Sequence, residues 1–379
     1  MAREKEATSS GGNNKANAKS LRDLRGQIDK IDQQVLKLIN DRARLASEIG
    51  QLKTDNGDEV FSLAREEEVL QNVLVLNDKS KGVLPRHAVR AVFREIMSGS
   101  RAMQKTFKVA FLGPEDSFSH LAALERYGSS IEFVAVNSIA TVFEEVDRGH
   151  VDFGVVPVEN STDGRISDTL EMFLRMPHLM ICAEIRLQIH HNLLANCEQQ
   201  EIRRIYSKPQ ALAQCRNWLS KNVPHAVLKD VASTAWAADL ASKEEGSAAV
   251  ASRQAAVKYG LRILFTEIED SPYNETRFAV IGRHRAGKTN RDKTALMFRL
   301  PHQPGSLVTA LSIFEQNKIN LTWIESFPAR TPQPEYLFFV DFEGHRDDPK
   351  VAKALKALEA VCAELTILGS FPMATNATS

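Results

Sequence analysis

The sequence has no excess of charge of either sign, because its 379 residues include 48 Lys and Arg against 48 Asp and Glu. It has no Lys- or Arg-rich run and few clustered aromatic residues, so nothing indicates a nucleic-acid partner or a charged membrane surface. No apolar run is long and uncharged enough to span a bilayer, and the first residues lack the apolar core of a signal peptide. These absences favour small-molecule chemistry in a cytoplasmic protein.

Cysteine is scarce, and the four present are scattered without a Cys-x-x-Cys pair or an adjacent histidine pattern. They are Cys182, Cys197, Cys215 and Cys362. Such spacing indicates neither a disulfide framework nor a zinc site. Buried, reduced thiols are expected, and no cofactor or metal is predicted.

What is present is an ordinary globular composition, sufficient for two or three domains with cores of their own. Changes of pattern along the chain predict a multidomain fold. We expect a disordered tail over 1–20, an all-helical module over 21–105, an α/β module over 107–283, a linker over 284–293 and an α+β module over 294–373.

Apolar residues of the first module alternate in steps of three and four, which predicts one long helix over 21–53 with a coiled-coil-like seam. The seam consists of Leu21, Leu24, Ile28, Ile31, Val35, Leu38, Leu45, Ile49 and Leu52. A break at 56–58 precedes two further helices, expected over 65–76 and 85–104.

A cation interrupts this seam, because the step from Leu38 to Leu45 lands on Arg42. A guanidinium at a buried seam position is costly unless an anion meets it. Lys53 follows on nearly the same face, roughly 16 Å along the axis, so the two can hold one small dianion from both ends. Arg25 lies about 25 Å from Arg42, so a role for it predicts a second chain and an intertwined dimer. The alternative for each residue is a solvated cation at the edge of a coiled coil.

The second module alternates short apolar strands with helices, which predicts an α/β fold with a largely parallel sheet, in two lobes around a cleft. The strands are expected over 108–112, 131–136, 151–158, 179–194, 203–206, 226–231, 248–251 and 276–282. Helices open on Asn160-Ser161, Ser207 and Ser233-Thr234, whose backbone N–H groups can hold a carboxylate. Each is also an ordinary helix cap when taken alone.

The third module has the β-α-β-β-α-β order of a ferredoxin-like fold. Its strands are expected over 295–300, 320–327, 336–342 and 366–371, and its helices over 305–316 and 348–364.

The helical module resembles the all-helical class of chorismate mutase. The residues that carry the resemblance are Leu24, Arg25, Asp41, Arg42, Lys53, Arg65, Glu66, Ser100 and Gln104. The resemblance implies a pericyclic rearrangement that needs no nucleophile, only a held conformer and stabilised charge. It assigns chorismate carboxylates to Arg42 and to Arg25 of a partner subunit, the ether oxygen to Lys53 and Gln104, and the ring hydroxyl to Glu66.

Three further residues have supporting roles in this resemblance. Arg65 and Ser100 would assist carboxylate binding. Ser62, which we include in substrate binding, stands where some members carry an acidic residue, so hydroxyl binding would depend more heavily on Glu66.

The α/β module resembles prephenate dehydratase. The motifs that carry this resemblance are V-P-V-E-N-S-x-x-G over 156–164, Thr169-Leu170, N-x-T-R-F over 274–278, Gly113-Pro114-Glu115, Phe118-Ser119, Pro209-Gln210-Ala211-Leu212, and Ala249-Val250-Ala251-Ser252 leading to Tyr259-Gly260. The implied fold is two-lobed and periplasmic-binding-protein-like.

The same resemblance implies that Thr276 lies beside the departing ring hydroxyl as a positioned hydrogen-bond donor. Arg277 and the turn Glu159-Asn160-Ser161 would bind or orient the dianion, and Asn274 and Phe278 belong to the same binding motif. In two departures from the family pattern, Asp116 brings a carboxylate toward an anionic ligand and Lys208 replaces a common histidine.

The third module resembles the phenylalanine-binding ACT domains attached to dehydratases. The two motifs supply Gly305, Ser306, Leu307, Glu325 and Ser326 as expected effector-binding residues. Phe327 stands where an arginine is usual and Ser306 where an alanine is usual, so weakened or retuned feedback is one expectation.

Together the three modules resemble the bifunctional chorismate mutase/prephenate dehydratase family. The resemblance implies chorismate and prephenate as substrates, L-phenylalanine as effector, a homodimer or higher homo-oligomer, and no cofactor, nucleic acid or membrane. Two alternatives stay open: arogenate in place of prephenate as the dehydratase substrate, and a ligand-sensing binding protein without catalysis.

Overall fold

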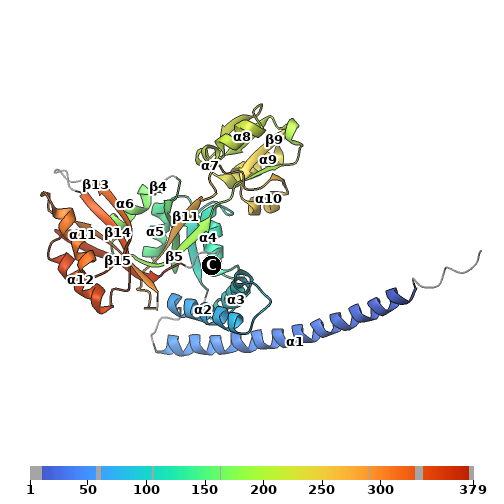
Figure 1. Ribbon diagram of the computed structural model, residues 1–379, viewed down its shortest axis with the longest axis horizontal. Coiled ribbons are helices and arrows are strands. Elements are labelled where there is room, and N and C mark those ends of the chain that lie inside the picture. The colour runs from blue at the N-terminus through green and yellow to red at the C-terminus, as the bar shows by residue number, and fades with distance from the viewer. Residues whose placement is uncertain are drawn as a thin grey trace, which may run out of the picture. The chain divides into compact units, whose positions relative to one another are not determined.

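The computed structural model (Figure 1) describes residues 11–56, 61–104, 106–162, 164–289, 291–328 and 336–374, and for residues 11–20 it describes the backbone alone. The described residues fall into two compact units, residues 11–56 with 99–104 and residues 61–98 with 106–374.

The first unit is dominated by helix α1 (Gly11–Asp55), accompanied by the last turn of helix α3 (Arg86–Ala102). The predicted long helix is confirmed, and it begins ten residues earlier than the sequence suggested. Residues 1–10 of the predicted tail lie outside the described residues. Every seam residue is exposed in the single chain, from 45% for Val35 to 67% for Leu38.

Helix α2 (Leu63–Lys79) and most of α3 belong to the second unit. Ser62 caps α2 by accepting a hydrogen bond from the Arg65 amide at 3.3 Å. Leu63 is buried in the same cluster as Phe107 and Tyr127. The module that the sequence predicted as one helical body is therefore shared between two units, because the apolar start of α2 packs on the α/β module.

The α/β module has two lobes, and the first is built on one mixed sheet. Its elements are β1 (Lys108–Leu112), α4 (Phe118–Tyr127), β2 (Glu132–Val136), α5 (Ile139–Asp147), β3 (Phe153–Asn160), β4 (Gly164–Arg165), α6 (Ser167–Arg175), β5 (Met180–Gln188) and β11 (Glu275–Gly282). The strand order is β2-β1-β3-β11-β5, with β4 beside β3. β1 runs parallel to β2 and β3, whereas β11 is antiparallel to both its neighbours.

The second lobe lies between residues 192 and 265 of the chain. Its elements are β6 (Asn192–Ala195), η1 (Gln199–Glu201), β7 (Arg204–Ser207), α7 (Pro209–Gln214), α8 (Arg216–Asn222), β8 (Val227–Asp230), α9 (Thr234–Lys243), β9 (Ser247–Ala251), α10 (Arg253–Tyr259) and β10 (Arg262–Phe265). The strand order is β10-β6-β9-β7-β8.

Three features of this module differ from the sequence prediction. No helix opens on Asn160-Ser161, because Asn160 ends β3 and the next helix, α6, begins at Ser167. The apolar run over 179–194 is two strands, β5 and β6, in different sheets, because the chain crosses between lobes at residues 189–191. The sheets are mixed rather than largely parallel, because β11 returns from the second lobe and inserts between β3 and β5. The two-lobed α/β fold itself is confirmed.

The last module is ferredoxin-like, as predicted. It consists of β12 (Asp292–Arg299), α11 (Ser306–Gln316), β13 (Leu321–Pro328), β14 (Tyr336–Glu343), α12 (Pro349–Glu359) and β15 (Glu364–Pro372). Its antiparallel sheet has the order β13-β14-β12-β15, which leaves β13 at one edge.

Strand alternation gives this sheet two apolar faces. Leu296 and Phe298 pack on one face with residues of α11 and α12. Ala295 and Met297 pack on the other face with residues of the first lobe, such as Ile181. The approach there is close, since a Cβ added to Gly369 on β15 would lie 2.2 Å from the Ile181 carbonyl oxygen. The sheet is thus clamped between its own helices and the first lobe.

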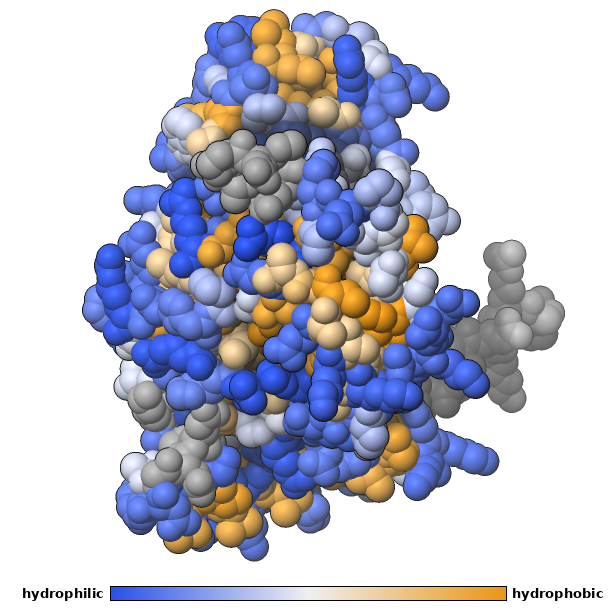
Figure 2. Space-filling model, turned by 90° about the vertical axis from the view of Figure 1, so that its left-hand side faces the viewer, coloured by the Kyte–Doolittle hydropathy of each residue, from blue (hydrophilic) through white to orange (hydrophobic). Residues whose placement is uncertain are grey.

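Figure 2 shows apolar side chains gathered near the middle of one face, among mostly hydrophilic neighbours. Within the described residues, no helix is long and apolar enough to cross a membrane. The four cysteines are free: Cys182 and Cys215 are buried, as predicted, whereas Cys197 and Cys362 are only partly buried.

Candidate active sites

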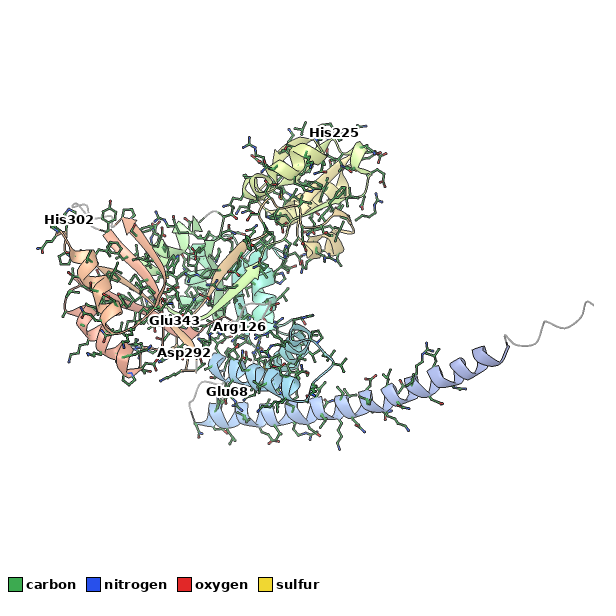
Figure 3. All side chains as sticks on the ribbon, in the orientation of Figure 1. Glu68, Arg126, His225, Asp292, His302 and Glu343 are labelled. Atoms are coloured by element: carbon green, nitrogen blue, oxygen red, sulfur yellow. The ribbon has the colours of Figure 1, made fainter. Side chains whose placement is uncertain are left out.

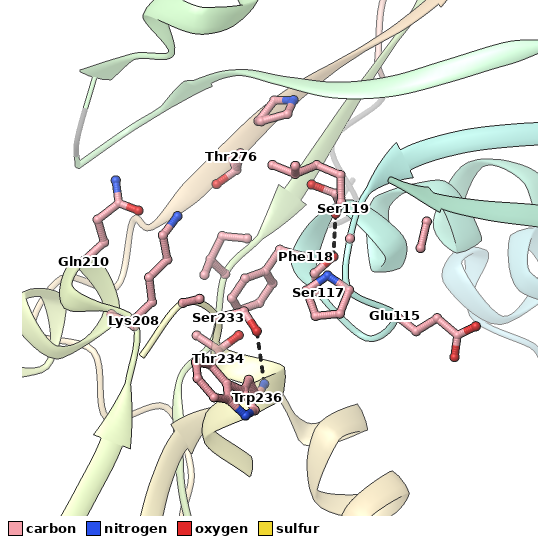
Figure 4. Close-up of a pocket in the computed structure, with 18 of the residues that line it drawn as sticks. Glu115, Ser117, Phe118, Ser119, Lys208, Gln210, Ser233, Thr234, Trp236 and Thr276 are labelled. Atoms are coloured by element: carbon pink, nitrogen blue, oxygen red, sulfur yellow. Dashed lines mark hydrogen bonds between the residues drawn. The ribbon is translucent and has the colours of Figure 1, made fainter. Parts of the chain in front are cut away.

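A pocket of about 820 Å³ lies between the two lobes (Figure 4). The first lobe contributes the start of α4, the end of β3 and the start of β11, and the second lobe contributes the starts of α7 and α9. Polar side chains that line it include Ser119, Asn160, Lys208, Gln210, Thr234 and Thr276. The predicted cleft is therefore a pocket with hydrogen-bonding groups on both walls.

Thr276 is held in this pocket by a buried amide. Asn160 Nδ2 donates to Thr276 Oγ1 at 2.8 Å, and Asn160 Oδ1 accepts from the Thr162 amide at 2.9 Å, which fixes the orientation of the Asn160 side chain. A hydroxyl that accepts through its oxygen still has a proton to donate. Thr276 lines the pocket, so its hydroxyl is placed where it can donate to a ligand there.

A chain of amides continues from this bond into the second lobe. Asn160 Nδ2 also donates to Asn274 Oδ1 at 3.1 Å, and Asn274 Nδ2 donates to Gln214 Oε1 at 3.0 Å. The same Gln214 oxygen lies 2.8 Å from His191 Nε2. The two lobes are thus joined behind Thr276 by hydrogen bonds between side chains.

Positive charge and helix N-termini also face the pocket. In Figure 4, Lys208 and Gln210 extend from the second lobe toward the end of β11 that carries Thr276. Helix α9 begins at the pocket, with the Ser233 hydroxyl accepting from the Trp236 amide at 3.0 Å. Helix N-termini favour anions, so this wall suits a carboxylate.

The structure divides the predicted dehydratase residues into two sets. Asn160, Thr276 and Phe278 line the pocket. Glu159, Ser161, Asn274 and Arg277 do not line it. Ser161 instead joins two loops, because its hydroxyl donates to the Tyr273 carbonyl at 2.6 Å and accepts from the Glu275 amide at 2.9 Å.

Arg277 is the main correction, since its side chain points away from the pocket. Residues alternate along a strand, so the residue between Thr276 and Phe278 faces the opposite side of the sheet. There Arg277 pairs with Asp341 of β14 and with Glu184 of β5, the latter at 3.4 Å. The sequence motif identified the strand but not the face on which each side chain lies.

Sequence reasoning assigned no role to Gln214 or His191, and it noted Lys208 only as a departure. Gln210 belongs to the motif Pro209-Gln210-Ala211-Leu212, which is the sequence feature that could have predicted its place in the pocket. The bonds of Gln214 depend on residues far away in the chain, so no local pattern shows them.

Asp116 does not line the pocket, contrary to the expectation. Lys258 of α10 lies 2.6 Å from Asp116 and 3.1 Å from Glu115, so the ion pair joins the lobes. These hydrogen bonds raise the pKa of Lys258 to about 12. The cation that balances Asp116 is therefore Lys258.

In the first unit, predicted mutase residues meet where α1 crosses the last turn of α3. Arg42 Nη1 donates to Ser100 Oγ at 2.7 Å, and Gln104 Nε2 donates to the Ala46 carbonyl at 2.6 Å. The crossing is close, since a Cβ added to Gly50 would lie 3.0 Å from the Gln104 side chain. Arg42, Ser100 and Gln104 therefore form one polar cluster. Lys53 lies partly buried further along α1, and Arg25 lies exposed on its earlier turns.

The remaining mutase residues belong to the second unit, where α2 begins. Arg65 pairs with Glu68 at 2.7 Å, and Glu66 lies 3.4 Å from Arg126 of α4 (Figure 3). Ser62 acts as the helix cap described above. Glu66 is mostly buried in its ion pair, whereas Arg65 is exposed.

The predicted effector residues lie on two elements of the ferredoxin-like module. Gly305, with φ of 85°, precedes α11, whose first residues are Ser306 and Leu307. On β13, Glu325 Oε1 and the Ser326 carbonyl both accept from Arg165 of β4, at 2.5 and 2.6 Å. Strand β13 therefore contacts the hairpin that follows Asn160.

Phe327, the departure noted on the same strand, is largely buried in the seam between the sheet and the first lobe. Its ring lies edge-on to Phe339, with the centroids 6.4 Å apart, and the Arg165 guanidinium lies 5.9 Å from its centroid. The side chain at this position packs inward rather than facing solvent.

These features define a multidomain enzyme class: a helical module, a two-lobed α/β module with a polar pocket, and a ferredoxin-like module on its sheet. Family models match all three, as chorismate mutase type II over residues 24–105, prephenate dehydratase over 109–286 and the ACT domain over 294–360.

Known proteins are similar to this chain over nearly its whole length. The bifunctional chorismate mutase/prephenate dehydratase of Aquifex aeolicus is 42% identical over 356 residues, covering 93% of this chain and 98% of that protein. The Stutzerimonas stutzeri protein of the same name is 41% identical, covering 94% and 99%. The structure of prephenate dehydratase from Arthrobacter aurescens in complex with L-Phe matches with a TM-score of 0.65 at 31% identity, over 70% of this chain and 89% of that one.

The chain belongs to the bifunctional chorismate mutase/prephenate dehydratase family. It is an enzyme with both catalytic domains and a C-terminal ACT domain.

Proposed function

We propose that this chain rearranges chorismate to prephenate with its helical module and converts prephenate to phenylpyruvate in the pocket between its lobes. The observation that carries the second activity is the Thr276 hydroxyl, oriented by Asn160 and facing Lys208 and Gln210 in that pocket. L-Phenylalanine acts as a feedback inhibitor through the ACT domain.

Dehydration needs a proton at the departing ring hydroxyl. Thr276 donates a hydrogen bond to this hydroxyl, which takes up one proton from solvent and leaves as water as its C–O bond breaks. The bond between the ring and its carboxylate breaks as well, carbon dioxide leaves, and the electron pair of that bond completes the aromatic ring. Lys208 and the N-terminus of α9 hold the carboxylates of prephenate. Phe278 supplies an apolar wall beside the ring.

Prephenate is favoured over arogenate because the two differ by a keto group against an ammonium group. Lys208 on the pocket wall attracts a dianion and repels a second cation. The relative turnover of the two substrates measures this preference.

The mutase activity is supported by the cluster of Arg42, Ser100 and Gln104 at the crossing of α1 and α3. Arg42 binds a carboxylate of chorismate with help from Ser100. Gln104 and Lys53 donate to the ether oxygen as negative charge develops there in the transition state.

Arg25 lies too far along α1 to join this cluster within one chain, about 25 Å away by helical rise. The exposed apolar seam of α1 fits a second copy, because nine apolar side chains in water are costly. We therefore propose a homodimer in which each chain supplies Arg25 to the other. The edge strand β13 offers a second surface for self-association.

We further propose that phenylalanine binds between the start of α11 and strand β13, using Gly305, Ser306, Leu307, Glu325 and Ser326. A cytoplasmic location is proposed as well, since the four scattered cysteines, all among the described residues, form no disulfide, which suits a reducing compartment.

One experiment tests these assignments together. Purified protein is given chorismate, prephenate or arogenate, and the products are followed separately with and without phenylalanine. Thr276→Ala should lower prephenate turnover by roughly 100-fold or more, leave chorismate turnover intact, and be partly rescued by Thr276→Ser. Normal prephenate turnover by Thr276→Ala would refute the role of this hydroxyl.

A further inference from the structure

The side chain of Arg277 lies at the seam between the first-lobe sheet and the ACT sheet. Arg277, Glu184 and Asp341 are 7%, 8% and 3% exposed, so their charges are almost completely removed from water. Buried charges are tolerated only where they are paired and hydrogen-bonded. The three side chains can therefore occupy only positions in which their opposite charges stay in contact.

The ACT side of the seam meets Arg277 with two neighbouring strands. Asp341 of β14 accepts from Arg277 Nη1, and the guanidinium stacks on the Trp323 ring of β13, 4.6 Å from its centroid. Trp323 and Asp341 are direct cross-strand partners. A shift of β13 against β14 therefore changes both contacts of Arg277 at once.

The first-lobe side fixes the same guanidinium within the sheet. Glu184 of β5 lies 3.4 Å from Arg277 Nη1, and Glu159 of β3 lies 3.7 Å from its Nε. Lys293 of β12 completes the group at 3.1 Å from Glu184. Since β11 is paired on both sides, the backbone of Arg277 is held in the sheet, and its buried guanidinium is held by these carboxylates.

Strand β11 connects this group to the pocket in a single residue step. Thr276 precedes Arg277 and accepts from Asn160 on the other face of the sheet. On the effector side, Trp323 precedes Glu325 and Ser326 on β13, and these two residues accept from Arg165. The geometry places the proposed effector strand and the proposed catalytic hydroxyl at opposite ends of one short path.

We propose that Arg277 is a positioning residue rather than a substrate ligand: it ties β11 to Trp323 and Asp341, so that the state of β13 sets the position of Thr276. The proposal rests on the proposed function, because it assigns the path by which phenylalanine at the ACT domain lowers turnover in the pocket. Arg277 touches neither ligand.

The test uses the full-length Asp341→Asn protein, which keeps the side-chain shape and removes the charge that faces Arg277. Prephenate turnover is measured with and without phenylalanine, and phenylalanine binding is measured separately by calorimetry. We expect phenylalanine to bind nearly as in the wild type, while its inhibition weakens at least about fivefold. Asp341→Glu should restore much of the inhibition, and KM for prephenate should change little in either variant.

A matched control separates this effect from general loss of stability. Ala354→Gly on α12 weakens the ACT domain on its helical side, away from the Arg277 seam, and should keep full inhibition. Thermal melting shows which variants fold. If Asp341→Asn does not fold, Arg277→Lys gives the same test, since it keeps the charge and loses the planar stack on Trp323.

Three results would overturn the proposal. One is unchanged inhibition in a folded Asp341→Asn protein. Another is a large rise in KM with unchanged inhibition in Arg277→Lys, which would indicate a substrate ligand. The third is a wild type that turns over prephenate but neither binds nor responds to phenylalanine. A wild type without prephenate turnover refutes the proposed function as well, and this distinguishes the two failures.

Discussion

At the scale of single residues, the pocket depends on a buried amide outside its lining. Asn274 lies behind Asn160, is 2% exposed, and links Asn160 to Gln214 by its oxygen and its nitrogen. Its removal takes away one hydrogen bond of Asn160 Nδ2 and one of Gln214 Oε1, while their contacts with Thr276 and His191 remain. Each lost bond contributes about 0.5–1.5 kcal/mol net. The position of Thr276 is therefore sensitive to a residue outside the pocket lining.

We predict that Asn274→Ala lowers kcat for prephenate roughly tenfold or more, with a smaller change in KM. Steady-state kinetics with prephenate, together with chorismate turnover as an internal reference, measures this. Asn222→Ala is the control, because this amide bonds only the local Trp218 carbonyl at 2.9 Å and should leave kcat unchanged. Equal losses in both variants would contradict the prediction.

The charge of Glu184 makes the stability of the folded protein depend on pH. Burial alone would raise the pKa of Glu184, but the charges of Arg277, Lys293 and Arg186 outweigh it and lower the pKa below the ordinary value of 4.5. A carboxyl with a lowered folded pKa stabilises the protein above its unfolded pKa, and this stability is lost as pH falls through the folded pKa.

Glu184→Gln should therefore cost about 3–5 kcal/mol at neutral pH, because buried Lys293 loses the carboxylate 3.1 Å away and Arg277 keeps Asp341 but loses one of its carboxylate neighbours. The difference in unfolding free energy from wild type should shrink as pH falls below about 4.5. Urea denaturation at a series of pH values measures it. A difference that stays constant from neutral pH to about pH 3 would contradict the assigned pKa direction.

At the scale of elements, the ACT sheet and the first lobe meet through backbone as well as side chains. Gly369 on β15 permits this contact, because any Cβ there would lie 2.2 Å from the Ile181 oxygen and under 3.1 Å from two more backbone atoms of Ile181. Backbone on a packed strand cannot give way as a side-chain tip does.

Gly369→Ala should therefore push β15 away from β5 and destabilise the seam by about 1–3 kcal/mol or more. Thermal melting should show a lower midpoint, and phenylalanine should inhibit less. Gly26→Ala on α1 is the matched control, since an added Cβ there meets nothing within 4 Å in the single chain. A melting midpoint that equals the wild type in Gly369→Ala would show that the seam can relax.

Local apolar patterns predicted some of these elements correctly and others wrongly. The period of the apolar residues predicted α1 and the ferredoxin-like order correctly, because both depend on local alternation. The apolar run over 179–194 looked like one strand, yet the chain crosses between lobes at residues 189–191. Both halves are buried in a sheet, and a buried strand has the same composition whichever sheet it joins.

At the scale of the whole molecule, the two activities belong to modules with different needs. The dehydratase pocket is complete in one chain, because both its walls come from residues of a single unit. The proposed mutase site needs Arg25 from a second copy, and the exposed seam of α1 is the surface that would bring it. Dimerisation through α1 should therefore affect only the first reaction.

Leu38→Glu tests this separation, since it places a charge at an apolar seam position that is 67% exposed in the single chain. Chorismate turnover should fall at least about tenfold, whereas prephenate turnover should stay near wild type. Leu36→Glu is the control: Leu36 is 63% exposed but lies off the seam. Equal chorismate turnover in the two variants would contradict the intertwined dimer.

The sequence alone determined the modules and most of their secondary-structure order, because periodicity is a local property. The resemblance to the family proposed Asn160, Thr276, Arg42 and Gln104 as site residues. Only the tertiary structure decided the direction of Arg277, the partner of Asp116 and the amide chain through Gln214. The physical reason is that each depends on which strand face or loop meets a residue distant in the chain. In every one of these cases a buried or bridging polar group takes the partner that the packing of separate elements brings within reach.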